Sequence, residues 1–161
     1  MSGIWMKGRF TCKNPQKYKG GDLSKIVFRS SWEKAFMTFC DVESDIIAWN
    51  SEIVTINYFD PVQNKNRRYF VDFQILTKNA DGSTQVTLVE IKPYKQTLRP
   101  RANSRKSQKT MTDEANTYAT NIAKWTAAKA LCAEKAWKFT IITERELFGG
   151  IDKGFKPPRR T

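Results

Sequence analysis

The sequence predicts an α/β domain in which a mixed β-sheet is flanked by helices. One observation is the order of hydrophobic patterns: a helical period, three segments of strand-like alternation, a long helical period and a last short strand. A second is the turn sequence NADGS, Asn79 to Ser83, between the second and third strand-like segments, which predicts an antiparallel hairpin. The chain has 161 residues, so we expect a single domain around one core.

The first helix is predicted by apolar residues that recur on one face of SSWEKAFMTFCD, residues 30–41. Ser30 followed by Glu33 is a capping box, in which each side chain accepts a hydrogen bond from the backbone of the other, so the helix is expected to begin there. Residues 1–28 are basic and rich in turn-forming residues, which predicts an N-terminal arm with little regular structure.

Strand-like alternation then covers Glu52 to Tyr58, Arg68 to Lys78 and Gln85 to Lys92. A charged connection, residues 93–109, leads to a long helix from Met111 to Lys135. The predicted buried stripe of this helix comprises Met111, Ala115, Tyr118, Ile122, Trp125 and Cys132. A short strand at 137–143, a helical turn at 144–148 and a basic tail at 149–161 are expected to complete the chain, with a catalytic core over 29–148.

The charge balance predicts a polyanionic partner. The chain carries 28 Lys and Arg residues against 16 Asp and Glu residues, a net charge of +12. Such a field attracts nucleic acid or an anionic membrane surface, and no basic amphipathic helix with an exposed apolar face favours lipid. No apolar run approaches the roughly 20 residues that span a bilayer, and the opening MSGIWMKGRF lacks a signal-peptide run. We therefore expect a soluble cytoplasmic protein with nucleic acid, and no membrane, as its partner.

The residue types that are missing restrict the chemistry. The sequence has no histidine, which excludes histidine-based triads and His-ligated zinc. Its three cysteines, Cys12, Cys40 and Cys132, lie far apart, so they form neither a disulfide framework nor a zinc knuckle and suit a reducing compartment. Any hydrolysis must therefore use carboxylates, lysine and a hard metal ion.

The candidate site lies in VTLVEIKP, where Glu90 and Lys92 leave the same face of a strand about 7 Å apart. If the hairpin loop is the five residues Asn79 to Ser83, the numbers of facing residues add to 162, and Asp72 lies directly opposite Glu90. A two-residue turn at Asp81 and Gly82 would instead turn Glu90 to the other face. The site hypothesis therefore requires an odd-numbered loop or a bulge.

Two adjacent carboxylates repel each other unless a proton or a cation lies between them. Magnesium prefers oxygen ligands, so Asp72, Glu90 and the backbone carbonyl of Ile91 form a reasonable open site for it. Lys92 would then lie next to the attacking water, where its charge can stabilise hydroxide or the developing phosphorane, or where it can take the proton if its pKa falls.

Asp72 followed by Glu90-Ile91-Lys92 resembles the motif of the PD-(D/E)XK nuclease superfamily, with Val71 in place of the motif's proline. The segments RSSWE, SEIVTINY, RRYFVDF, VEIKP and FTIITERELF resemble, in the same order, the N-terminal domain of the TnsA transposon endonucleases. The opening KGRFTCKNPQKYKGGDLSKIVFRSSWE is similar to that of nucleases of T-even-type phages that act at head completion. The resemblance implies a restriction-endonuclease-like core, with Glu33 as a third acidic residue of the site that holds the metal together with Asp72 and Glu90.

The same resemblance implies a metal-dependent endo- and exonuclease acting on double-stranded DNA, with Mg²⁺ as cofactor and Mn²⁺ as substitute. Its role would be phage head completion and head–tail joining, by trimming packaged DNA, with head, portal or neck proteins as partners. The location would be the cytoplasm of the infected host cell, with association with the virion left open. Two alternatives remain: a non-enzymatic basic DNA-binding protein at the portal vertex, and a subunit of a larger recombination machine.

Each site residue also has a structural interpretation. Glu90 and Lys92 could form an exposed ion pair worth at most about 1 kcal/mol. Asp72 interrupts an apolar run and could belong to a structural ion pair, while the capping box alone would account for Glu33. Glu52 is a rival third carboxylate, interpreted as structural because it begins a predicted strand.

A basic strip follows the candidate site. A solvated loop is the alternative to a surface that binds the DNA backbone without base specificity. The strip comprises Lys95, Arg99, Arg101, Arg105, Lys106 and Lys109.

Overall fold

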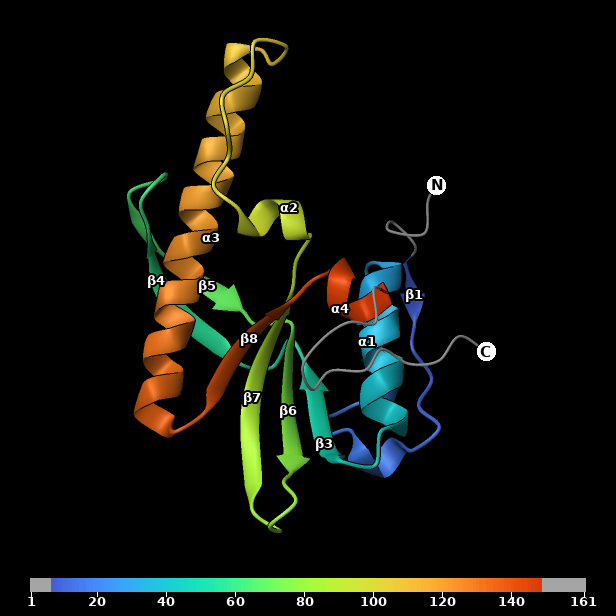
Figure 1. The fold of residues 1–161 in the computed structure, drawn as a ribbon. Coiled ribbons are helices and arrows are strands. Elements are labelled where there is room, and N and C mark those ends of the chain that lie inside the picture. Colours follow the sequence, from blue (N-terminus) through green and yellow to red (C-terminus); the bar gives the residue numbers. More distant parts are fainter. Residues whose placement is uncertain (1–6, 149–161) are drawn as a thin grey trace.

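The structure, a computed structural model, describes residues 7–148. Within these residues, a four-stranded sheet has the order β3 (Ile46–Ser51), β6 (Phe73–Lys78), β7 (Thr84–Ile91) and β8 (Lys138–Ile142) (Figure 1). The pairs β3–β6 and β6–β7 are antiparallel, and β7–β8 is parallel. The predicted α/β class with a mixed sheet is confirmed.

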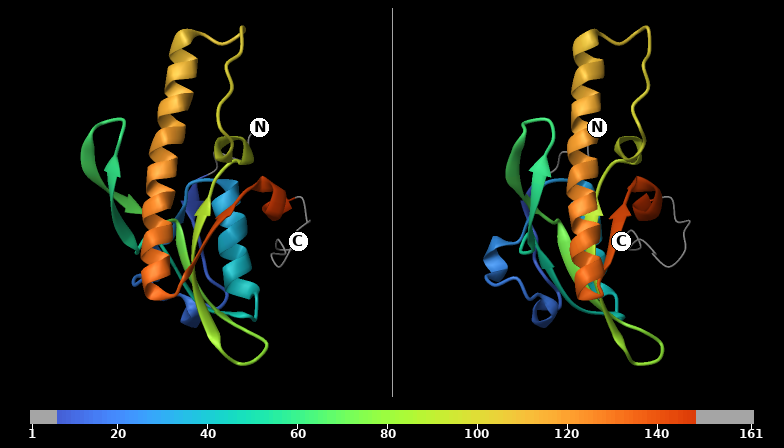
Figure 2. Two further views of the ribbon diagram at one scale, coloured as in Figure 1. Left: turned by 60° about the vertical axis from the view of Figure 1, so that its left-hand side comes forward. Right: turned by 90° about the vertical axis from the view of Figure 1, so that its left-hand side faces the viewer.

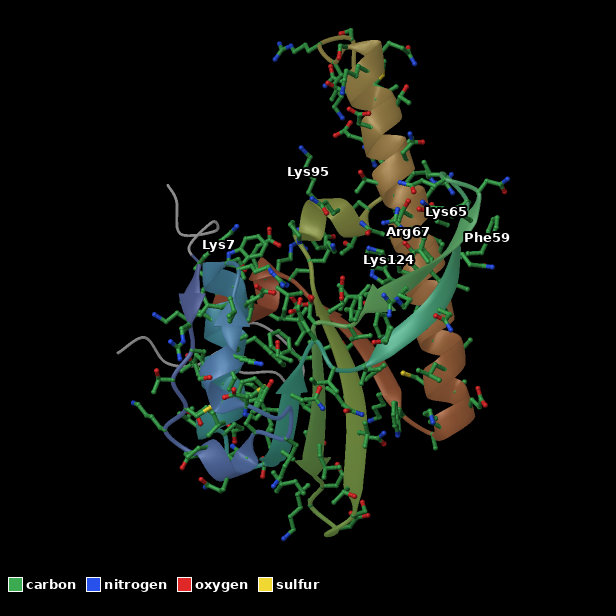
Figure 3. The ribbon with its side chains drawn as sticks, turned by 180° about the vertical axis from the view of Figure 1, so that it is seen from behind. Lys7, Phe59, Lys65, Arg67, Lys95 and Lys124 are labelled. Atoms are coloured by element: carbon green, nitrogen blue, oxygen red, sulfur yellow. The ribbon has the colours of Figure 1, made fainter. Side chains whose placement is uncertain are left out.

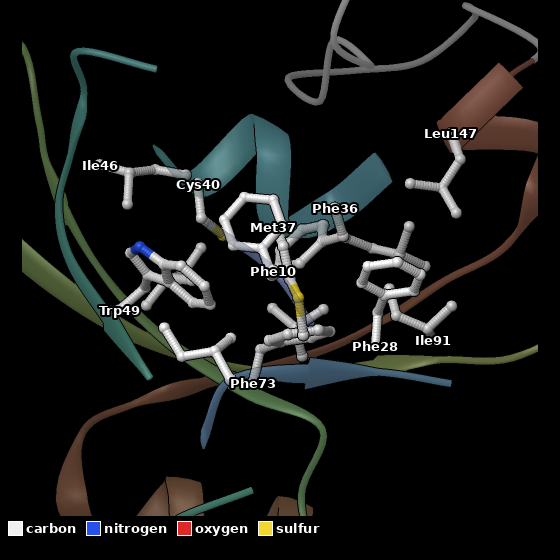
Figure 4. Close-up of a cluster of buried hydrophobic side chains, with 14 residues drawn as sticks. Phe10, Phe28, Phe36, Met37, Cys40, Ile46, Trp49, Phe73, Ile91 and Leu147 are labelled. Carbon is white, nitrogen blue, oxygen red and sulfur yellow. The ribbon is translucent and has the colours of Figure 1, made fainter. Parts of the chain in front are cut away.

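Helices cover opposite faces of this sheet. Val89 of β7 packs in one core cluster with Phe36 of α1 (Ser31–Val42), while Leu88 packs in a second cluster with Ala128 of α3 (Gln108–Lys135). Because neighbouring residues of a strand point to opposite faces, α1 and α3 lie on opposite sides of β7. Figure 4 shows the aromatic side chains of the first cluster packed between α1 and the sheet.

Helix α1 begins where the capping box predicts. The Ser30 hydroxyl accepts a 3.1 Å hydrogen bond from the N–H of Glu33. The Glu33 carboxylate accepts from the N–H of Arg29, one residue before the cap, at 2.5 Å. Of the predicted apolar face, Phe36 and Cys40 are buried, and Trp32, Ala35 and Phe39 pack partly buried against the same core.

The β6–β7 hairpin has the predicted register. Phe73 faces Val89 and Lys78 faces Thr84, which leaves the five residues Asn79 to Ser83 as the loop. The Asn79 N–H donates to the Ser83 carbonyl at 2.8 Å, and Gly82 adopts a φ of 88°. Glycine adopts positive φ without a steric penalty, so Gly82 suits this turn.

The predicted strand from Arg68 to Lys78 is wrong as one element. It divides into β5 (Lys65–Phe70) and β6, and β5 pairs with β4 (Thr55–Asp60) in a separate two-stranded ribbon. In one continuous strand, Val71 and Phe73 would share a face. In the structure Val71 joins the cluster under α3 and Phe73 joins the cluster under α1, so the chain must break between them.

The predicted strand from Glu52 to Tyr58 also begins too early. Strand β3, which was not predicted, ends at Ser51, and Glu52 then adopts a φ of 56° before β4 begins at Thr55. A positive φ is incompatible with a continuing strand.

The described part of the predicted N-terminal arm has little regular structure, as expected, but it packs onto the domain. Its short elements are β1 (Gly8–Arg9), η2 (Pro15–Lys17), η3 (Leu23–Lys25) and β2 (Val27–Phe28). Phe10, Ile26 and Phe28 are buried in the α1 core, so this segment belongs to the core rather than to a detached arm.

Helix α3 covers the sheet with its C-terminal half, where Asn121, Trp125, Ala128 and Cys132 are buried. Its N-terminal half projects past the sheet (Figures 1 and 2). The predicted stripe therefore fails in the projecting half, where Ala115 is exposed, and it also fails at Ile122, which is 40% exposed beside the buried Asn121. No helix among residues 7–148 is long and apolar enough to cross a bilayer.

One short helix precedes α3 in the chain, and another follows β8. Helix α2 (Tyr94–Thr97) forms within the predicted connection, and α4 (Glu144–Phe148) confirms the predicted final turn. The predicted basic tail, 149–161, lies outside the described residues.

Candidate active site

Asp72 and Glu90 lie next to each other where β6 begins and β7 ends. The hairpin register, continued by one residue, places them opposite each other, and Asp72 Oδ2 accepts a 2.8 Å hydrogen bond from the N–H of Ile91. Burial raises the pKa of Asp72 well above its usual value, and the charge of Glu90 raises it further. The Ile91 carbonyl points to the same edge of β7 as its N–H, towards Asp72.

Glu90 is held on two sides. Its side chain lies at the buried end of β7, and its Oε2 accepts a 2.6 Å hydrogen bond from the Tyr69 hydroxyl. Its Oε1 lies 3.7 Å from Nζ of Lys92. Glu90 is only 5% exposed, so this is not the solvated surface pair considered from the sequence.

Tyr69 was not predicted as a site residue. Burial raises the pKa of Tyr69, and the neighbouring charge of Glu90 adds to the rise, so the hydroxyl remains a donor. In the predicted continuous strand Tyr69 and Asp72 would point to opposite faces. The break at residues 71–72 brings both towards Glu90, and no local sequence pattern reveals that break.

Glu33 lies in the first turn of α1, close enough to Glu90 for their charges to interact. Burial raises the pKa of Glu33, and the charges of Glu52 and Glu90 raise it further. The hydrogen bond from the Arg29 N–H and the positive charge of Arg29 act in the opposite direction. The Glu33 carboxylate accepts a hydrogen bond from the Arg29 N–H at the start of the helix, so the capping role considered from the sequence is also present. Glu52 forms an ion pair with Arg29, and its N–H donates to the Asp72 carbonyl at 3.0 Å.

The donor set suits a hard cation held by two carboxylates. Within residues 7–148, no three Asp, Glu or Cys side chains gather closely enough to hold a metal ion. Glu33 is therefore not part of a ready-made three-acid cluster. Glu90 is buried and Asp72 partly buried, and the two carboxylates repel each other, so a divalent cation with oxygen ligands would relieve that repulsion.

Two further cations approach this pair, and neither was singled out from the sequence. Nζ of Lys124, on α3, lies 5.6 Å from the ring centre of Tyr69 and 6.0 Å from that of Tyr58. NH1 of Arg67, on β5, lies 3.5 Å from Oδ2 of the buried Asp60. Figure 3 shows Lys124 and Arg67 between α3 and the β4–β5 ribbon.

The predicted basic strip lies along α2 and the loop that returns beside the projecting half of α3. A groove of about 760 Å³ separates loop and helix, lined by Lys95, Arg99 and Arg101 among others. Lys106 pairs with Glu114 at 2.8 Å and Lys109 with Asp113 at 2.7 Å. These two cations are thus partly neutralised.

A mixed sheet between two helices, with a carboxylate pair and a lysine at the end of a central strand, defines the restriction-endonuclease-like class of fold. The family model of TnsA-like endonuclease N-terminal domains matches residues 43–144. The chain is 39% identical, over 140 residues, to the head completion nuclease of Enterobacteria phage T4, covering 85% of this chain and 90% of that protein. The chain therefore belongs to the TnsA-like endonuclease family. No solved structure matches it significantly.

Proposed function

We propose that the protein is a metal-dependent deoxyribonuclease that hydrolyses phosphodiester bonds of double-stranded DNA at the end of β7. The observation that carries this proposal is the pair of facing carboxylates, the buried Glu90 and the partly buried Asp72, with Lys92 3.7 Å from Glu90. Membership of an endonuclease family and similarity to a phage nuclease support it.

Asp72, Glu90 and the Ile91 carbonyl would hold Mg²⁺, with Mn²⁺ as a substitute. The ion would supply positive charge to the phosphate and a more acidic water. Tyr69 holds Glu90 in place, and the Lys92 ammonium lies where it can stabilise the attacking oxygen and the charge of the pentacoordinate phosphorus. Water adds to phosphorus and releases a proton to solvent as the bond to the leaving sugar oxygen breaks, and that oxygen takes up a proton from solvent. Glu33 would assist from α1 by adjusting the charge of the site.

The biological role would be phage head completion and head–tail joining, in which endo- and exonuclease activity trims packaged DNA. The similarity to a head completion nuclease supports this part of the proposal. Head, portal or neck proteins would be partners, and the host cytoplasm or the virion the place of action. Binding to the DNA backbone would use Lys95, Arg99, Arg101 and Arg105, with smaller contributions from Lys106 and Lys109.

Incubation of the protein with plasmid and linear DNA, in Mg²⁺ and in EDTA, tests the activity. We expect cleavage in Mg²⁺ and none in EDTA. The cleavage rate should fall by about 100-fold or more in Asp72→Ala and in Lys92→Ala. Both variants should still bind DNA. Equal cleavage by wild type and both variants would reject the nuclease. A protein that binds DNA but never cleaves it would instead fit a non-enzymatic head-completion protein.

A further inference from the structure

The fold brings two lysines from different elements, Lys92 and Lys124, close enough for the charge of Lys92 to act on Lys124. Lys92 follows β7, and its N–H is fixed by a 3.0 Å hydrogen bond to the Ile142 carbonyl of β8. Lys124 comes from α3 and is partly buried. Burial lowers the pKa of Lys124, and the charge of Lys92 lowers it next. Cations that approach in this way are stabilised when an anion lies between them.

Lys124 is held in place by its surroundings rather than by an acid of its own. Its ammonium lies over the rings of Tyr58 and Tyr69, both of which are buried on the inner face of the β4–β5 ribbon. Among residues 7–148, no carboxylate lies within ion-pair distance of it. No ion pair within the described residues therefore neutralises the charge of Lys124, which can meet a ligand.

Arg67 extends the positive charge along the same face. Arg67 and Tyr69 are two residues apart in β5 and therefore share the inner face of the ribbon with Lys65. Asp60 orients the Arg67 guanidinium at 3.5 Å, and the Val62 and Gln63 N–H groups and the Thr120 hydroxyl hold Asp60. Figure 3 shows Lys124, Arg67 and Lys65 following one another from the site towards the tip of the ribbon.

Two buried polar groups lie on either side of Lys124 in the sequence of α3. Asn121 and Trp125 are 5% and 4% exposed, and Nδ2 of Asn121 and Nε1 of Trp125 make no hydrogen bond within the described chain. They lie three residues before and one residue after Lys124, in the part of α3 that covers the sheet. Both donor atoms are closed to solvent, so they do not contact a phosphate themselves, and Lys124 is the side chain of this turn that offers a charge to a ligand.

We propose that Lys124 and Arg67 form a second phosphate subsite, which binds a phosphodiester next to the one cleaved at Asp72 and Glu90. The DNA strand then continues along the inner face of the β4–β5 ribbon past Lys65. The subsite deepens the proposed nuclease function and rests on it for the identity of the ligand. Lys124 lies in the half of α3 that covers the sheet and Arg67 lies in β5, so both are separate from the basic strip of residues 95–109, which ends in the first turn of α3.

The test uses end-labelled duplexes in which a single phosphate is replaced by a neutral methylphosphonate. In single-turnover cleavage by the wild type, the substitution suppresses cleavage at a neighbouring bond as well as at the modified one. In Lys124→Met this neighbouring suppression disappears, and cleavage of unmodified DNA falls by about 10-fold. Lys124→Arg keeps the charge and retains most of the activity.

Lys129→Met is the matched control, because Lys129 is an exposed lysine on the same helix. If Lys124→Met cleaves like Lys129→Met and shows the wild-type pattern of suppression, the subsite is wrong. If no protein cleaves DNA, the nuclease proposal fails, and the salt dependence of binding in EDTA tests the subsite alone. A slope of log K against log salt smaller by about 0.9 in Lys124→Met than in Lys129→Met supports the subsite, and equal slopes overturn it.

Discussion

The Tyr69 hydroxyl donates a 2.6 Å hydrogen bond to Oε2 of Glu90, from a strand that belongs to a different sheet. Tyr69 lies in the β4–β5 ribbon, whereas Glu90 ends a strand of the four-stranded sheet. The ribbon is thus attached to the candidate site through a buried, charge-assisted hydrogen bond. Such a bond fixes the direction of the carboxylate and leaves its other oxygen towards Lys92.

Tyr69→Phe removes this donor and keeps the ring. We expect a 10- to 100-fold decrease in cleavage, roughly the effect of losing a group that orients a ligand residue. The loss of a hydrogen bond to a buried charge should also lower the free energy of unfolding by about 1.5–3 kcal/mol. Urea unfolding and single-turnover cleavage measure the two effects. Tyr58→Phe leaves the bond in place and serves as the control; equal behaviour of the two variants would contradict the role of Tyr69.

The register of the candidate site could be predicted from the sequence because it depends on local features. The NADGS loop fixes which residues of β6 and β7 face each other, and Ser30 with Glu33 fixes the start of α1. Tyr69 and Lys124 could not be found in this way. Tyr69 reaches Glu90 only because the chain breaks at residues 71–72, and Lys124 reaches the same region only because α3 packs against the ribbon.

Asp72→Asn should make the folded protein more stable at neutral pH in EDTA while abolishing cleavage. Burial and the charge of Glu90 raise the pKa of Asp72 in the folded state, so folding favours the protonated acid. The stabilising contribution of the protonated Asp72 is therefore fully present below the ordinary pKa of Asp and is lost as pH rises through the raised folded pKa. The amide does not titrate, and it can still accept the hydrogen bond from Ile91.

Urea unfolding at a series of pH values from 4 upwards tests the Asp72 prediction. The difference in unfolding free energy between Asp72→Asn and the wild type should grow in favour of the variant as pH rises. Asp81→Asn, in the exposed loop, is a control in which no such growth is expected. If the unfolding free energies of wild type and Asp72→Asn change in parallel with pH, the pKa of Asp72 is not raised by folding.

A divalent metal ion should offset the loss of stability that the repulsion between Asp72 and Glu90 causes. A ligand that binds only the folded state at 100 times its Kd adds about 2.7 kcal/mol to stability, so Mg²⁺ should raise the Tm of the wild type. The rise should be much smaller in Asp72→Asn, which offers one negative charge fewer. Calorimetric scans across a Mg²⁺ series at constant ionic strength provide the measurement. Identical shifts in both proteins would place the ion elsewhere.

Glu33→Gln separates the capping role of Glu33 from its role in the site. The amide oxygen of Gln can still accept from the Arg29 N–H, so the unfolding free energy should change by less than about 0.5 kcal/mol. Cleavage should fall by about 10-fold, because a charge near Glu90 is lost. Glu33→Ala, which removes the cap as well, should also lose about 1 kcal/mol of stability. Full activity in Glu33→Gln would leave Glu33 as a helix cap alone.

The basic strip should bind DNA through the cations that have no acid beside them. Arg99, Arg101 and Arg105 make no ion pair among the described residues, whereas Lys106 and Lys109 are paired with Glu114 and Asp113. Replacing the three arginines with Ala should weaken binding to every DNA sequence alike and reduce the salt slope by about 0.9 for each lost phosphate contact. Lys106→Ala with Lys109→Ala is the comparison, and its effect per charge should be smaller because each lysine already has a partner. Binding isotherms across a salt series provide both values, and a loss confined to one sequence would mean that the strip reads bases instead of phosphates.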